Sequence, residues 1–256
     1  MLVDAHAHLD DPILAPREEE VVAAAKRAGV GIIVNASSDL PSSEASVALA
    51  KRWAEIYAVI GVHPHEAKTY SPEAEKRLVE LRTYEKVVAL GEIGLDYHYD
   101  LSPREDQKKV LEREIALSDE LCLPVVFHVR EAYEDFNAII ERNKRYLTRG
   151  VLLHCYGGSA ELAKYYAKEL DAYFSFGGVL TFAKHKDVVL ATISEDRLLL
   201  ETDCPYMTPV PFRGTPNEPK NIPLVRDKMA ELKGLSREEV TRITTENALR
   251  FYHIDL

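Results

Sequence analysis

The sequence predicts an α/β fold in which eight parallel strands alternate with helices and close into a (β/α)8 barrel. Three observations indicate this fold class. Short, nearly continuous apolar runs alternate with amphipathic segments along the whole chain, which is typical of a parallel sheet covered by helices. The length of 256 residues suits such a barrel, which uses about 250 residues as one domain. Histidines and acidic residues, which can bind metal ions, recur where the apolar runs end.

The apolar runs are the predicted strands. Each has the length of a strand and is followed by a segment with helical periodicity. A run that is apolar on both faces fits the wall of a barrel, which is covered by the interior on one side and by helices on the other. We therefore expect a TIM-type barrel that forms one domain over residues 1–256. The strands are expected at residues 2–8, 31–36, 58–62, 87–93, 124–129, 151–154, 172–176 and 198–202.

The amphipathic segments are the predicted helices. Several carry signals of a helix start. Ser71 and Ser102 each precede a proline, which places serine at the cap and proline in the first turn. Ser236 with Glu239 forms a capping-box pattern. The helices are expected at residues 17–28, 42–53, 72–84, 103–121, 133–146, 160–170, 185–193, 222–233 and 237–252.

Composition narrows the class of protein. A net charge of -10 disfavours broad binding to polyanions, which depends on lysine and arginine. It does not exclude a phosphate ester substrate, because bound divalent ions would supply local positive charge. Cys122, Cys155 and Cys204 form no C-x-x-C pair, which favours reduced thiols. Neither a leader peptide nor an apolar stretch of ~20 residues is found. We expect a soluble cytoplasmic protein, with no membrane contact and no obligate protein partner evident.

Two histidines end the first predicted strand. His6 and His8 are two residues apart, so the alternation of a strand places both imidazoles on the same side. Two neutral nitrogen ligands in this arrangement can bind one metal ion. An H-x-H pair alone is weak evidence, but its place at a strand end strengthens it.

Glu92 lies inside the fourth apolar run, between Gly91 and Gly94. A carboxylate there is costly unless it is paired, and a cation is its natural partner. Its two oxygens could bridge two metal ions. A buried ion pair with a lysine or arginine is the alternative.

Three more candidate ligands end later runs. His128 and His154 end the fifth and sixth, and Asp203 follows the eighth. Since parallel barrel strands end on one face, all six residues should converge there around divalent metal. Asp203 can both hold a metal and accept the proton of bound water as catalytic base. Glu201 has the same parity, but the strand end favours Asp203.

Two further residues are candidates for substrate binding. His63 follows the third strand together with His65, and it could contact a leaving group or phosphate, or else fix the loop by a hydrogen bond. Arg130 lies on the same side of its strand as His128 and could hold a phosphate or carboxylate in bidentate fashion. An ion pair with a loop acid is the alternative for Arg130.

Six sequence blocks in this order resemble the TatD family of metal-dependent deoxyribonucleases, in the amidohydrolase superfamily. The likeness covers the whole chain, and the order and spacing of the blocks are more specific than any one of them. Two positions depart from the family pattern, Pro216 and Ala183, where many relatives carry a basic residue. The blocks are residues 3–10 (VDAHAHLD), 61–65 (GVHPH), 91–96 (GEIGLD), 124–130 (PVVFHVR), 153–158 (LHCYGG) and 200–205 (LETDCP).

The resemblance implies a site with two divalent ions, which could be Zn, Mn, Mg, Fe, Co or Ni. One ion would be bound by His6, His8, Glu92 and Asp203, and the second by Glu92, His128 and His154. Family members hydrolyse phosphodiester bonds in DNA, some as exonucleases that also act on RNA. The resemblance therefore implies nucleic acid as the substrate, as single strands or ends, with Asp203 and Glu92 as catalytic residues.

Two other functions remain open at this stage. A small-molecule hydrolase of the same superfamily would act on a lactone, amide or phosphoester. Relatives of that kind commonly bridge their metals with a carboxylated lysine on the fourth strand, where this chain has Glu92. A noncatalytic protein could instead use the metal as a structural staple. Structural sites are usually closed and often use cysteine thiolates. The candidate ligands here are histidines and acids at a barrel mouth, which disfavours a structural role.

Overall fold

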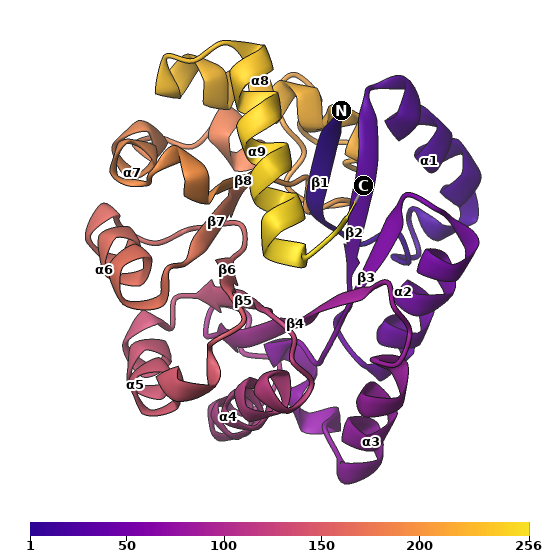
Figure 1. Cartoon of the computed structure of the whole chain (residues 1–256), viewed down its shortest axis with the longest axis vertical. Helices are drawn as coiled ribbons and strands as arrows, with labels where there is room; N and C mark the ends of the chain where they lie inside the picture. The colour runs from indigo at the N-terminus through magenta and orange to yellow at the C-terminus, as the bar shows by residue number, and fades with distance from the viewer. Residues whose placement is uncertain (256) are drawn as a thin grey trace.

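The computed structural model describes residues 1–255 as eight parallel strands surrounded by helices (Figure 1). The strands follow one another in sequence order around a single sheet. After β8, the N–H groups of Asp203 and His8 donate to the carbonyls of His6 and Cys204, both at 2.9 Å, and so close the ring onto β1. The strands are β1 (Leu2–Ala7), β2 (Val30–Ala36), β3 (Ile56–Ile60), β4 (Val87–Asp96), β5 (Val125–Arg130), β6 (Val151–Leu153), β7 (Tyr173–Phe176) and β8 (Leu198–Leu200).

Helices connect the strands and form the outer layer. Short 3-10 helices lie in several of the connections, and two α-helices follow β8. The α-helices are α1 (Glu18–Arg27), α2 (Leu40–Arg52), α3 (Pro72–Leu81), α4 (Arg104–Glu120), α5 (Tyr133–Asn143), α6 (Ala160–Leu170), α7 (Lys186–Thr192), α8 (Ile222–Lys233) and α9 (Arg237–Tyr252). The 3-10 helices are η1 (Ala15–Arg17), η2 (Pro64–Thr69), η3 (Lys144–Tyr146), η4 (Gly178–Thr181), η5 (Glu195–Arg197) and η6 (Pro219–Asn221).

The predicted fold class is confirmed, while some element boundaries move. β4 runs beyond residue 93 because Gly94 to Asp96 continue to pair with β5. β8 ends at Leu200 rather than at residue 202. Ser71 and the Ser236–Glu239 capping box cap α3 and α9 as predicted.

The predicted serine cap of α4 is wrong. Pro103 occupies the cap position, without a side-chain hydrogen bond to the helix. The Ser102 hydroxyl instead donates to the carbonyl of His65 at 2.7 Å and accepts the N–H of Lys68 at 3.2 Å. This hydroxyl therefore ties the loop after β4 to η2, which follows β3, and is not available to cap the helix.

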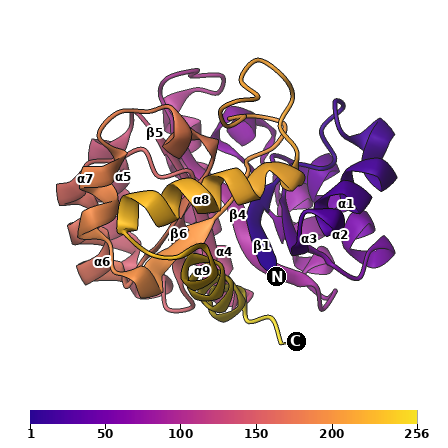
Figure 2. The same ribbon diagram turned by 90° about the horizontal axis from the view of Figure 1, so that it is seen from above.

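Helix α9 covers the N-terminal end of the barrel. Its residues Ala248, Phe251 and Tyr252 belong to the same buried cluster as interior strand residues such as Val34 and Leu199. The Tyr252 hydroxyl donates to the carbonyl of Ala5 at 2.7 Å. In Figure 1 this helix crosses in front of the strands, and Figure 2 places the loop between β8 and α8 at the opposite end. The other end of the barrel is therefore where loops and strand ends can form a site.

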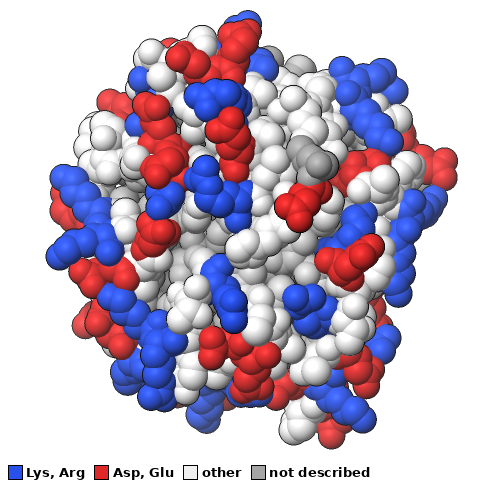
Figure 3. All heavy atoms as spheres, in the orientation of Figure 1, with Lys and Arg blue, Asp and Glu red and all other residues white. Residues whose placement is uncertain are grey.

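The face that α9 crosses carries acidic and basic side chains in close alternation (Figure 3). Neither sign of charge dominates that face. None of the helices within residues 1–255 combines the length and apolar composition that crossing a bilayer requires. Cys122, Cys155 and Cys204 are all free.

Candidate metal centre

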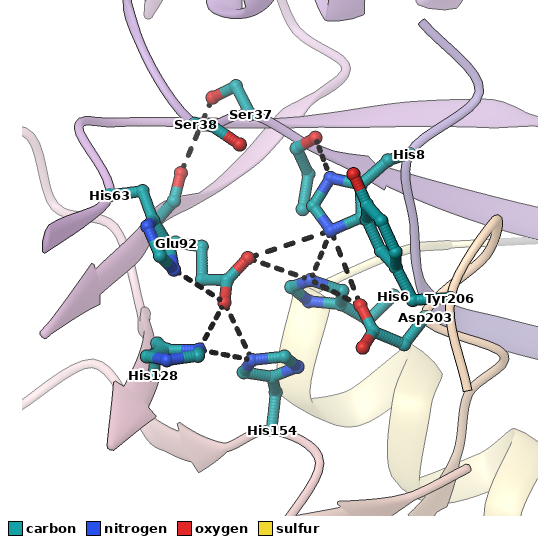
Figure 4. Close-up of polar contacts among 12 residues, drawn as sticks. His6, His8, Ser37, Ser38, His63, Glu92, His128, His154, Asp203 and Tyr206 are labelled. Carbon is teal, nitrogen blue, oxygen red and sulfur yellow. Dashed lines mark hydrogen bonds and ion pairs between the residues drawn. The ribbon is translucent and has the colours of Figure 1, made fainter. Parts of the chain in front are cut away.

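All six predicted metal ligands meet at the C-terminal end of the barrel. They come from β1, β4 and β5 and from the residues that follow β1, β6 and β8. Figure 4 shows their side chains pointing at one another, with Glu92 in the centre. The convergence follows from the parallel ring, which brings the ends of distant strands to one face.

The first group of candidate ligand atoms belongs to His6, His8, Glu92 and Asp203. The two histidine Nε2 atoms lie 3.3 Å apart. The Glu92 Oε2 atom lies 3.1 Å from His6 Nε2 and 3.7 Å from His8 Nε2. The Asp203 Oδ1 atom lies 3.9 Å and 3.4 Å from the same two nitrogens. A tetrahedral ion with bonds of about 2.0 Å has ligand atoms separated by about 3.3 Å, so the spacing suits a metal ion.

The second group uses the other oxygen of Glu92. Its Oε1 atom lies 2.7 Å from His154 Nε2 and 2.8 Å from His128 Nδ1. These two nitrogens are 3.3 Å apart. Glu92 thus directs one carboxylate oxygen toward each group of histidines.

Hydrogen bonds on the far side of two rings set which nitrogen faces the cluster. The Nδ1 of His8 lies 3.0 Å from the carbonyl of Ala36, which can only accept, so Nδ1 carries the proton. The Nε2 of His128 lies 2.9 Å from the Asp96 carboxylate, which leaves Nδ1 with a free lone pair. In both rings the nitrogen inside the cluster is therefore the one that can bind metal.

His63 also faces the cluster, but its hydrogen bonding differs. Its Nδ1 accepts the N–H of His65 at 3.1 Å, so the proton of the neutral ring lies on Nε2. That Nε2 is 3.5 Å from Glu92 Oε1. Burial lowers the pKa of His63 to about 4, which keeps the ring neutral near pH 7. The position of His63 next to Glu92 and His128 would allow it to bind a metal ion. Its hydrogen bonding instead makes Nε2 a proton donor.

The two carboxylates are held in the charged form. Burial disfavours the charge of Glu92, but His154, His63 and His6 around it hold its pKa well below the ordinary value. Burial likewise opposes the charge of Asp203, whose pKa is lowered by the hydrogen bond to His8 and by the surrounding imidazoles. Two buried anions this close require positive partners.

The histidines show the reverse effect. Burial alone would lower the pKa of His8, but Asp203 and Glu92 outweigh it and raise that pKa to about 9. The pKa values of His128 and His154 are also raised, against burial, by Asp96, Glu92 and Glu201. These rings bind protons that a metal ion would displace.

Two acids outside the predicted set support the cluster. Asp96 contacts His128 and also lies 3.0 Å from His65 Nε2. Glu201 lies 3.7 Å from His154 Nδ1 and accepts a hydrogen bond from the Ser175 hydroxyl at 2.5 Å. Sequence reasoning noted Glu201 only as an alternative to Asp203 and gave Asp96 no role. The signal for Asp96 was its spacing of four from Glu92 on one strand.

Local backbone features bring these side chains into place. Gly94 has φ of +151°, and a Cβ there would lie 1.8 Å from the carbonyl oxygen of His128, so glycine allows β4 and β5 to approach closely at the site. Asp203 adopts φ of +54° just after β8, a left-handed conformation that aspartate tolerates better than most residues. The turn directs its carboxylate back over His6 and His8.

Arg130 lies at the end of β5 and is half-buried. Its guanidinium stacks on the Tyr99 ring at 4.8 Å from the centroid. Within residues 1–255 no carboxylate lies at ion-pair distance from it, which does not support the loop ion pair considered for this residue. Its role in binding substrate stays a prediction.

Comparisons with known proteins agree with this fold and site. The TatD related DNase family matches residues 3–253. An uncharacterized metal-dependent hydrolase of Bacillus subtilis, YabD, is 43% identical over 100% of both chains. The 3'-5' ssDNA/RNA exonuclease TatD of Cronobacter sakazakii is 32% identical over 91% of each. The crystal structure of YJJV, a TatD homologue of Escherichia coli, has a TM-score of 0.92 and 29% identity, covering 99% of this chain and 98% of its own.

The barrel and the histidine and carboxylate cluster at its open end define a metal-dependent hydrolase. The chain belongs to the TatD family.

Proposed function

We propose that this protein is a deoxyribonuclease that hydrolyses phosphodiester bonds of DNA, and also of RNA, from strand ends. The proposal includes two divalent ions. His6, His8, Glu92 and Asp203 would bind one, and Glu92, His128 and His154 the other. The relative from Cronobacter sakazakii, named a 3'-5' ssDNA/RNA exonuclease, supports the substrate class.

One observation carries the proposal. The two oxygens of Glu92 point to different histidine groups, at 3.1 Å from His6 Nε2 and 2.7 Å from His154 Nε2. A carboxylate shared in this way would hold two ions, which together supply the chemistry used for in-line displacement at phosphorus. Bound there, divalent ions would supply a Lewis acid for the phosphoryl oxygens and a water acidic enough to lose its proton near pH 7.

Asp203 has the properties of the catalytic base. Its lowered pKa keeps the carboxylate ionised at neutral pH, so it can accept the proton of the attacking water. Its side chain is 12% exposed, at the mouth where a phosphodiester would arrive. The left-handed turn after β8 holds it in this position.

His63 and Arg130 act on the substrate. The Nε2–H of His63 donates to the leaving sugar oxygen or to a phosphate oxygen next to Glu92. Arg130 has guanidinium donors available at the end of β5 and contacts a phosphate oxygen. Neither residue is required to bind metal in this scheme.

The proposal is tested with metal-loaded protein and end-labelled DNA and RNA, single-stranded and duplex, beside panels of lactones, amides and phosphotriesters. The expected result is shortening of single strands from one end, lost in the Asp203→Asn variant. Hydrolysis confined to the small-molecule panels would assign the second candidate function. Full metal content with no turnover of any substrate would indicate a structural metal site.

A further inference from the structure

Two stacked pairs, each of one aromatic ring and one arginine, lie at the open end of the barrel. Arg130 stacks on Tyr99 at 4.8 Å, and Arg213 stacks on Phe182 at 3.9 Å from the ring centroid. Tyr99 lies in the loop after β4, and Phe182 in the loop after β7. In a ring of eight strands in sequence order, these loops stand on different sides of the mouth.

The rings are exposed although they are large and apolar. Tyr99 is 54% and Phe182 40% exposed. A folded chain buries such rings where it can, so exposure of both beside a site suggests a ligand that covers them.

Within residues 1–255, the two arginines also lack an acidic partner. Most arginines of this chain pair with acids, as Arg113 does with Glu75 at 2.6 Å. Within the described residues 1–255, neither Arg130 nor Arg213 lies at ion-pair distance from a carboxylate, and the one polar contact of the Arg213 guanidinium is a hydrogen bond to the carbonyl of Thr208. In a protein of net charge -10, two unneutralised guanidinium groups beside the site are complementary to a polyanion.

The Arg130–Tyr99 pair lies near the candidate metal centre, and the loop that carries Arg213 also carries Tyr206 next to that centre. The Tyr99 ring lies 5.4 Å from the His65 ring, which lies 6.2 Å from His128. On the other side, the N–H of Val210 donates to the Thr181 hydroxyl at 2.9 Å, which joins the loop that carries Arg213 to the loop that carries Phe182. Tyr206 of the same loop lies 6.1 Å from His8 (Figure 4).

We infer that these pairs are stacking platforms for the unpaired bases of a single nucleic-acid strand that crosses the mouth. A flat ring covered by a guanidinium offers stacking and positive charge together, as proteins that bind single strands do. Bases inside a duplex have both faces covered by their neighbours, so only unpaired bases fit. This inference rests on the proposed function and names the residues that would bind the bases of its substrate.

The test compares two single strands of equal length, oligo-dT and a fully abasic strand that keeps the sugar-phosphate chain but has no bases. KM and kcat are measured for each with metal-loaded wild type and with Tyr99→Leu, Phe182→Leu, Arg130→Lys and Arg213→Lys. The lysine variants keep the positive charge but lose the planar guanidinium group that stacks on the ring. Arg145→Ala is the matched control, because Arg145 stacks on Tyr146 at 4.7 Å in η3, at the N-terminal end of the barrel.

Each platform variant should raise KM for oligo-dT, relative to KM for the abasic strand, by about tenfold, which is the typical effect of losing one stacked base. The control should leave this ratio unchanged. Equal effects on both strands, or lysine variants that match wild type, would overturn the inference. If wild type cleaves neither strand, the proposed function fails, and fluorescence anisotropy of the same strands then decides the inference. Preferential binding of oligo-dT that the variants lose would sustain it, and equal binding would overturn it.

Discussion

The carboxylate of Asp4 on β1 accepts two hydrogen bonds from Thr202, from the backbone N–H at 2.8 Å and from the hydroxyl at 2.5 Å. Both residues are fully buried, and burial raises the pKa of Asp4 to about 8. Asp4 precedes His6 by two residues, and Thr202 immediately precedes Asp203. This contact therefore joins β1 to the segment just after β8, beside the candidate metal centre.

Replacing Asp4 with alanine should lower the free energy of unfolding by about 2–4 kcal/mol, because it leaves a buried N–H and a buried hydroxyl without partners. Urea unfolding of the metal-loaded protein measures this loss. Glu231→Ala is the control, since Glu231 is 68% exposed in its pair with Lys228 and should change stability by less than about 0.5 kcal/mol. Equal effects of both substitutions would show that the contact contributes nothing.

Metal content should depend on which ligand is removed. His8→Ala should lose one ion and His128→Ala the other, whereas Glu92→Ala should lose both, because both groups share its carboxylate. Elemental analysis of dialysed protein gives the number of ions per chain. His98→Ala is the control, because His98 pairs with Glu131 at 2.8 Å outside the cluster. A Glu92→Ala protein that kept two ions would contradict the bridging role.

Asp203→Asn should reduce kcat on single-stranded DNA by at least about 100-fold, since the amide cannot accept the proton of the attacking water. The circular dichroism spectrum should change little, because asparagine keeps the size and shape of aspartate. Elemental analysis of the variant shows whether turnover is lost with the base alone or with an ion that Asp203 would bind. Asp227→Asn, on α8 in an ion pair with Arg237 at 3.0 Å, is the control and should keep full activity. Near-normal turnover by Asp203→Asn would remove this residue from the role of base.

Removal of metal should abolish activity and also lower the melting temperature. The buried charges of Glu92 and Asp203 then have only protonated histidines as partners, and a ligand that binds only the folded state stabilises it. Differential scanning calorimetry before and after chelation measures the change, and adding back each divalent ion in turn should restore both properties. A chelated protein with an unchanged melting temperature would argue against ions at this cluster.

Glu114 predicts a dependence of stability on pH. It is fully buried on α4, where its carboxyl accepts the N–H of Val62 at 2.8 Å, and burial raises its pKa well above the ordinary 4.5. Because the folded pKa is raised, the stability that this group contributes is complete below pH 4.5 and is lost as pH rises toward the folded pKa.

The Glu114→Gln variant keeps an oxygen acceptor but cannot ionise. Its free energy of unfolding should therefore rise relative to wild type between pH 5 and pH 8, by up to about 1.4 kcal/mol per pH unit. Urea unfolding of both metal-loaded proteins across this range measures the difference. Glu112→Gln is the control, at a side chain 42% exposed, and should show no such trend. A constant difference between Glu114→Gln and wild type would show that Glu114 ionises normally.

The sequence predicted the barrel and the convergence of six side chains, because all strands of a parallel ring end on the same face. The sequence did not predict the roles of Asp96 and Glu201, since both depend on contacts with histidines on other strands. The same holds for Ser102, whose partners lie in η2. A serine before a proline looks the same in sequence whether it caps its own helix or binds a neighbouring loop.

By itself the sequence determined the fold class, the succession of elements and the choice of His6, His8, Glu92, His128, His154 and Asp203 as residues that meet. The periodicity of apolar residues and the direction of the strands can be read from neighbouring residues in the sequence. Only the tertiary structure decided which nitrogen of each ring faces the cluster, because a carbonyl, a carboxylate or an N–H from a distant segment must approach the other side of the ring. The tertiary structure likewise decided that the Nε2 of His63 carries a proton. It also decided that Tyr99 and Phe182 stay partly exposed while each stacks against an arginine. Both properties depend on neighbours from other strands and loops.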